Sequence, residues 1–229
     1  MQHIVHNLIA VKKRLHDYAL KYNRDPAAIT LLAASKTQSV EAIKTAYQAG
    51  QRIFGENYLQ EALPKISALP SDIEWHFIGH IQRNKTKHIA SHFAWVHSVD
   101  NIIIVKRLND QRPSNLPPLN ICIEVNLGHE ESKSGVRTIE EIINIANFCK
   151  TLPNIHCRGL MAIPPAYKTF NEQRQACHQL ATFNEKCAEQ KIFFDTLSIG
   201  MSDDLEAAIA EKSTLVRVGT AIFGTRIPS

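Results

Sequence analysis

Short apolar runs alternate with helical patterns eight times along this chain, and no other feature restricts the fold as strongly. The first run, at 29–35, is almost continuously apolar, as buried strands are, and a helical pattern of Val40, Ile43 and Tyr47 follows it. Eight strand–helix units in one chain predict a single (β/α)8 TIM barrel of the α/β class, with an open doubly wound sheet as the alternative. The other predicted strands are 52–55, 74–78, 95–99, 120–125, 156–161, 195–199 and 215–218.

The residues before the first strand predict an additional N-terminal helix. Ile4, Leu8, Val11 and Leu15 recur at helical spacing, and charged residues interrupt them before the apolar core of a signal peptide could form. The proline-rich stretch at 113–118 predicts a surface loop and not a linker, because the strand–helix alternation resumes unchanged after it. We therefore expect one domain over residues 1–229, close to the length of about 250 residues that such barrels occupy.

Composition excludes several classes of protein. The five cysteines are odd in number and form no CxxC motif, which argues against a disulfide framework or a zinc site and suits a reducing compartment. The apolar runs are far shorter than the roughly 20 residues that cross a membrane. The 26 basic and 22 acidic residues give a net charge of +4 and are mixed along the chain, with one dense basic patch at 82–87. We expect a cytoplasmic protein that binds neither membranes nor nucleic acids nor metal.

Lys36 stands where the first predicted strand ends. In a TIM barrel the functional residues lie at the carboxyl ends of the strands, so Lys36 is expected at the mouth of the barrel. A partly desolvated amine loses its proton more readily and then attacks carbonyl groups. The alternative is a lysine that extends into solvent from the barrel mouth.

Small residues and hydroxyls follow the seventh and eighth strands. Gly200 and Ser202 occupy the first of these loops, and Gly219 and Thr220 occupy the second. TIM barrels frequently bind phosphate in these two loops, although turn glycines and helix caps have the same composition. The chain contains neither a GxGxxG nor a Walker motif.

An amine and a phosphate site that face one cavity are the two features that pyridoxal phosphate requires. Arg217, on the eighth strand, is a candidate partner for the pyridine nitrogen, which would then stay unprotonated because arginine keeps its own charge. The cofactor would be a weaker electron sink than one paired with a carboxylate. An ion pair of Arg217 with Glu124 is the alternative.

Several motifs, in order along almost the whole chain, resemble the pyridoxal phosphate homeostasis protein family. They are Ser35-Lys36-Thr37, FGENYLQE at 54–61, WHFIGHIQRNK at 75–85, RGLM at 158–161, LSIGMSDD at 197–204 and the segment 216–224. The family has the alanine-racemase-like barrel, so the resemblance implies a fold-type III protein that binds pyridoxal 5'-phosphate as a Schiff base. One departure is Lys212, where such proteins often have glycine.

The resemblance also implies the role of each site residue. Lys36 would carry the cofactor and Arg217 would face the pyridine nitrogen. Asn57 and Met161 would line the pocket. The cofactor-binding residues that we expect are Lys36, Asn57, Met161, Ser198, Gly200, Met201, Ser202, Arg217, Gly219 and Thr220.

The same resemblance leaves two roles open, carrier and enzyme. Racemisation needs a base on each face of the carbanion, and alanine racemases supply one from a separate C-terminal domain that is not expected here. We therefore expect a monomeric protein of intracellular pyridoxal phosphate homeostasis, which buffers the cofactor or delivers it to apo-enzymes, without catalytic residues. The alternatives are a pyridoxal-phosphate-dependent amino-acid racemase and a cofactor-free, phosphate-binding enzyme that uses His76, His80, Glu56 or Asp203.

Overall fold

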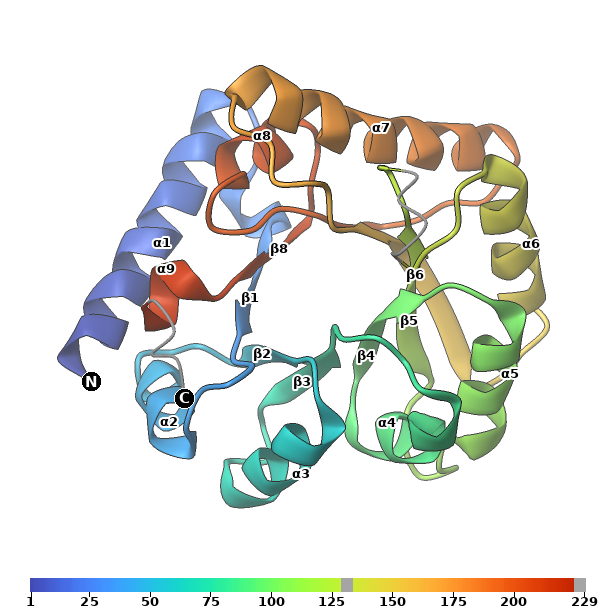
Figure 1. Cartoon of the computed structure of the whole chain (residues 1–229), viewed down its shortest axis with the longest axis horizontal. Coiled ribbons are helices and arrows are strands. Elements are labelled where there is room, and N and C mark those ends of the chain that lie inside the picture. Colours follow the sequence, from blue (N-terminus) through green and yellow to red (C-terminus); the bar gives the residue numbers. More distant parts are fainter. Residues whose placement is uncertain (129–133, 225–229) are drawn as a thin grey trace.

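The eight strands lie side by side in chain order, and the last pairs with the first. A computed structural model describes residues 1–128 and 134–224, and all its strand pairings are parallel, so the sheet closes into a barrel (Figure 1). The predicted (β/α)8 barrel is confirmed, and each strand boundary agrees with the sequence pattern to within one residue. The strands are β1 Thr30–Ala34, β2 Ile53–Glu56, β3 Glu74–Phe77, β4 Trp95–Val99, β5 Leu119–Val125, β6 Ile155–Ala162, β7 Thr196–Ser198 and β8 Leu215–Val218.

Helices surround the barrel, and several begin at the side-chain caps that such helices favour. Thr138 and Thr169 each form a capping box with the glutamate three residues later, and Ser39 caps the helix after β1. The helices are α1 Gln2–Lys21, α2 Val40–Gln48, α3 Leu59–Ala68, α4 Thr86–His92, α5 Ile102–Gln111, α6 Ile139–Cys149, α7 Phe170–Glu189, α8 Leu205–Ala210 and α9 Thr220–Phe223, with short 3-10 turns at Pro26–Ala28 and Arg83–Lys85.

The additional N-terminal helix is confirmed as well. α1 buries Ile4, Leu8, Val11 and Leu15 and packs against α8 and α9, which follow the last two strands (Figure 1). It therefore supports the side of the barrel on which the predicted phosphate loops lie. Within the described ranges, no helix is both long and apolar enough to cross a membrane.

The barrel interior is a separate core from the larger one between sheet and helices. Its apolar part includes Leu32, Ala34 and Leu215 in one cluster and Trp95, Cys122 and Met161 in another. Between these clusters lie buried polar side chains that form one hydrogen-bonded chain, which is described below.

An irregularity in β6 determines which of its side chains face this interior. Cys157 pairs with Ile121 but Gly159 pairs with Cys122, so Arg158 is an extra residue in the pairing. An extra residue reverses the inward and outward alternation beyond it. Met161 consequently packs inside the barrel against Trp95, with 1% of its surface exposed.

Candidate functional site

Lys36 follows β1 at the carboxyl end of the barrel, as its position in the sequence predicts. Ala34 pairs with Gly55, so the same register brings Lys36 level with Asn57 beyond the end of β2. Lys36 also continues the alternation of Leu32 and Ala34, whose side chains lie inside the barrel. Its own side chain is half-buried.

A buried ion pair fixes the strand ends next to Lys36. Nζ of Lys65, on α3, lies 2.9 Å from Oε1 of Glu56 and donates to the carbonyl of Ser35 at 3.1 Å. The Ser35 hydroxyl donates to the same carboxylate at 2.5 Å. Burial raises the pKa of Glu56, while Ser35 and Lys65 act in the opposite direction. Glu56 is therefore engaged with α3, outside the barrel, and these contacts argue against it as an acid–base group of a cofactor-free site.

The loops after β7 and β8 meet beside β1. Gly200 has a φ of +108°, a conformation that favours glycine, and its carbonyl accepts the N–H of Arg217 at 2.8 Å. In the same loop the Ser202 hydroxyl accepts the N–H of Ala221 at 3.2 Å. A Cβ on Gly219 would lie 3.1 Å from the carbonyl oxygen of Ala34, so this loop passes close to the strand that carries Lys36.

These contacts bring four of the predicted phosphate-loop residues, Gly200, Ser202, Gly219 and Thr220, to one side of the barrel mouth. Thr220 is the first residue of α9 and is exposed. Met201 is 38% exposed, and its N–H donates to the Asp204 carboxylate at 2.5 Å, so its backbone is used locally.

Arg217 is buried in the barrel and held by three hydrogen bonds. Nη1 donates to the carbonyl and the hydroxyl of Ser198, both at 2.6 Å, and Nη2 donates to the carbonyl of Ala162 at 3.0 Å. Nε has no acceptor among the described residues. Burial lowers the pKa of Arg217, while Asp204, Cys122 and Glu124 act to raise it. No described contact pairs Arg217 with Glu124, so the ion pair considered as the alternative is absent from this part of the chain.

Ser198 belongs to a hydrogen-bonded chain that crosses the barrel interior. Its hydroxyl lies 2.8 Å from Nδ1 of His97, and Nε2 of His97 lies 2.9 Å from Nδ1 of His76. Nε2 of His76 then lies 2.8 Å from Oε1 of Glu74, at the opposite end of the barrel. Burial lowers the pKa of both histidines, so both are neutral at pH 7.

The donors of this chain are consistent in one direction only. The Glu74 carboxylate can only accept, so a neutral His76 donates to it from Nε2 and accepts at Nδ1, which leaves Nδ1 of His97 to accept the hydroxyl hydrogen of Ser198. A neutral His97 then donates from Nε2 to His76, which in turn donates to the Glu74 carboxylate. Arg217 is thus positioned by a chain that ends at the far opening of the barrel. Sequence reasoning missed His97 and Glu74 and considered His76 only as an acid–base group of a cofactor-free enzyme, although the alternation of these residues with outward residues in β3 and β4 was visible.

Asn57 lies near the barrel mouth as predicted, and its side chain has an unusual environment. Its Oδ1 is buried and has no hydrogen-bond partner, which is rare for a polar atom and marks a site that a donor can fill. His80 and Asp203, considered for a cofactor-free enzyme, are both exposed, and His80 contacts the Ser134 hydroxyl at 3.0 Å.

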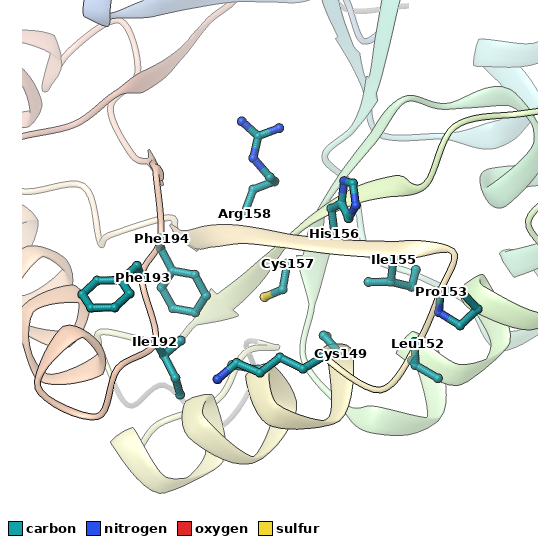
Figure 2. Close-up of a pocket in the computed structure, with 12 residues that line it drawn as sticks. Cys149, Leu152, Pro153, Ile155, His156, Cys157, Arg158, Ile192, Phe193 and Phe194 are labelled. Atoms are coloured by element: carbon teal, nitrogen blue, oxygen red, sulfur yellow. The ribbon is translucent and has the colours of Figure 1, made fainter.

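A cavity of about 450 Å³ lies away from all the predicted site residues. It is formed near the amino end of β6 by Cys149, Cys157, Lys150, Phe193 and Phe194, among others. Figure 2 shows Cys157 on the side of β6 that faces Cys149, with His156 and Arg158 on the other side of the strand. In TIM barrels the chemistry lies at the carboxyl ends of the strands, so we place no cofactor here. Among the described residues, no cluster of histidine, cysteine and carboxylate side chains could hold a metal ion.

Comparison with known proteins identifies the class and then the family. The model of the family "Alanine racemase, N-terminal domain" matches residues 1–227. The alanine racemase of Corynebacterium glutamicum shares the fold, with a TM-score of 0.71 and 15% identity over 96% of this chain and 60% of that one. The chain is therefore a barrel of the alanine racemase N-terminal class.

Two more similar proteins narrow the assignment. A pyridoxal phosphate homeostasis protein of Pseudomonas aeruginosa is 50% identical over 99% of this chain and 97% of its own length. The structure of PipY from Synechococcus elongatus PCC7942, with pyridoxal phosphate bound, has a TM-score of 0.82 and 33% identity, over 96% of this chain and 100% of PipY. The chain belongs to the pyridoxal phosphate homeostasis protein family, as its motifs indicate.

Proposed function

We propose that this chain binds pyridoxal 5'-phosphate as a Schiff base on Lys36 and acts in the homeostasis of that cofactor, by buffering or delivering it. The observation that carries the proposal is the joint position of Lys36, the glycine-lined loops and Arg217 around one barrel mouth. Bound pyridoxal phosphate in PipY supports the cofactor, since PipY is similar over nearly the whole chain.

The residues of the mouth fit the chemical parts of the cofactor. Gly200 and Gly219 let the backbone approach a phosphate closely, and the hydroxyls of Ser202 and Thr220 add donors. Nε of Arg217 would be the donor to the pyridine nitrogen, because the other nitrogens of Arg217 hold Ser198 and Ala162. When bound, the cofactor supplies an aldehyde with which primary amines form Schiff bases, and one amine can replace another. Met161, Met201 and Asn57 are proposed to line the pocket, and Ser198 acts on the cofactor through Arg217.

A carrier role is proposed in preference to racemisation. A racemase needs a second base opposite the lysine, and tyrosine serves alanine racemases. Tyr58, the tyrosine nearest the end of β2, is the N-cap of α3 and is 56% exposed, so it is poorly placed for that role. We propose a monomer in the cytoplasm whose macromolecular partners are pyridoxal-phosphate-dependent apo-enzymes, contacted transiently.

Titration of the cofactor-free protein with pyridoxal phosphate, followed by visible absorption, tests the proposal. We expect a Schiff-base band that borohydride abolishes and that Lys36→Ala prevents. Lys44→Ala, on the neighbouring helix α2, is the matched control and should leave the band unchanged. Wild-type protein that forms no band at saturating cofactor would overturn the proposal, whereas amino-acid turnover by the loaded protein would favour the racemase.

A further inference from the structure

One half of the barrel mouth is a cavity that the proposed cofactor residues other than Asn57 leave open. Those residues lie mainly after β7, β8 and β1, whereas a cavity of about 270 Å³ lies at the carboxyl ends of β2 to β6. We call it the β2–β6 cavity. The residues that matter for its chemistry are Asn57, Ser98, Glu124, Asn126, Ile78 and Ile163. Asn57, which is level with Lys36, connects it to the cofactor site.

Hydrogen-bond acceptors line the inner part of this cavity. Asn57 Oδ1 is buried without a partner. The Glu124 carboxyl makes no hydrogen bond or ion pair with the residues that the structure describes. The Ser98 hydroxyl donates its hydrogen to the carbonyl of Gly79, so toward a ligand this hydroxyl can only accept. A ligand that donates several hydrogen bonds would satisfy these atoms together.

The charges around Glu124 favour a cation. Burial raises the pKa of Glu124, Asp100 in the loop after β4 raises it further, and Arg217, across the barrel, lowers it. The resulting pKa is about 7, so the carboxyl is half-protonated at neutral pH. His80 is the other titratable side chain that lines the cavity, and it is exposed. A bound cation would complete the ionisation of Glu124 and release its proton.

We propose that the β2–β6 cavity receives the side-chain ammonium group of a lysine from another protein, with Glu124 and Asn57 accepting its hydrogen bonds. The proposal rests on the proposed function, because it identifies the lysine of an acceptor apo-enzyme as the amine brought beside Lys36. Ammonium is a compact donor of three hydrogen bonds, which matches the acceptors described above.

The outer part of the cavity distinguishes a lysine side chain from a free amino acid. Ile163, which is 43% exposed, offers apolar surface to the four methylenes of lysine, and the buried Ile78 adds to the apolar lining of the cavity. An α-amino acid would carry a carboxylate next to its ammonium group, and that carboxylate would lie near Glu124 and Asp100. No arginine or lysine lines the cavity among the described residues to compensate for that repulsion.

Calorimetric titration of the cofactor-free protein at pH 7, in two buffers of different ionisation enthalpy, tests this site. The probes are Nα-acetyl-lysine methylamide, butylammonium and L-alanine. We expect the first two to bind and to release about half a proton per site, as a pKa of about 7 implies, and alanine to bind at least tenfold more weakly. Glu124→Gln should weaken lysine binding at least tenfold and abolish the proton release.

Two further variants keep the test decisive. Glu185→Gln removes an exposed carboxylate on α7 and should leave binding unchanged. Ile163→Lys places a lysine at the rim of the cavity and should block the probes without affecting the core, which circular dichroism checks. The proposal is overturned by no binding to wild type, by equal binding to Glu124→Gln, or by alanine binding as tightly as the lysine probe. Since no cofactor is present, such a result would leave the proposed Schiff base on Lys36 untouched.

Discussion

Nδ1 of His76 lies 2.9 Å from Nε2 of His97 in the centre of the barrel, and both rings are almost completely buried. The pair joins Glu74, at one opening, to Ser198 and Arg217, near the other. Two buried neutral histidines thus serve as the link that orients the proposed partner of the pyridine nitrogen.

Replacing His97 with phenylalanine should reveal what this link contributes. The Ser198 hydroxyl and Nδ1 of His76 would both lose their partner, at about 1–3 kcal/mol each, so we expect the free energy of unfolding to fall by about 2–6 kcal/mol. The Schiff-base absorption should also shift, because Arg217 is held less firmly. Urea unfolding and absorption spectra measure both effects.

His88→Phe is the control for this substitution, since His88 is exposed on α4 and should change stability by less than about 0.5 kcal/mol. If His97→Phe were as stable as wild type and had the wild-type spectrum, the hydrogen-bonded chain from Glu74 to Arg217 would have no positioning role.

Glu124 should make stability depend on pH. Its pKa is raised from 4.5 to about 7 in the fold, so between these values the folded protein holds a proton that the unfolded chain has released. The contribution of Glu124 to stability is therefore present at low pH and is lost as pH rises through about 7. Glu124→Gln cannot titrate, so its stability relative to wild type should improve by about 2–3 kcal/mol from pH 5 to pH 8.

Urea unfolding of both proteins at pH 5 and pH 8 gives this difference directly. The two buried histidines titrate in wild type and variant alike, so their contribution cancels. A constant difference in the free energy of unfolding between the two proteins across this pH range would show that the fold does not raise the pKa of Glu124.

Gly200→Ala should damage both the fold and the cofactor site. Gly200 has a φ of +108°, and a Cβ there would lie 2.6 Å from Cβ of Ala208 on α8. Backbone strain and overpacking together should cost at least about 2 kcal/mol. Gly224→Ala is a matched control, with a φ of +92° and no atom of the described residues within 4 Å of the added Cβ. Thermal unfolding should show a clearly smaller loss for the control; equal losses would exclude the steric part of the argument.

The thiols should react slowly in the native protein. Burial raises the pKa of Cys122 and Cys177 to about 12 and that of Cys187 to about 11, so few thiolates exist at pH 8. The hydrogen bond with Cys149 and burial raise the pKa of Cys157 as well, but Cys157 is partly exposed at the cavity shown in Figure 2, so it should be the first of these thiols to react. Labelling with a chromogenic disulfide should give one early thiol, absent in Cys157→Ser, and all five in urea. Rapid labelling of every cysteine in the folded state would contradict the burial described here.

The local pattern of the sequence was sufficient to predict the strands and the position of Lys36 at the end of β1, because both depend on short apolar runs and on where those runs end. It was not sufficient for side-chain orientation in β6, since the extra residue at Arg158 that turns Met161 inward depends on pairing with β5. The hydrogen-bonded chain joins side chains from β3, β4, β7 and β8. Glu124 acquires its raised pKa from burial and from Asp100, against the opposing effect of Arg217. These properties arise only when the barrel closes and brings distant strands together.

The most direct test of the account is to locate the attachment point of the cofactor. Protein loaded with pyridoxal phosphate is reduced with borohydride, digested, and mapped by mass spectrometry. We predict one stoichiometric adduct on the peptide that contains Lys36, with the remaining lysines unmodified. An adduct on another lysine in wild type, with Lys36 unmodified, would contradict the account.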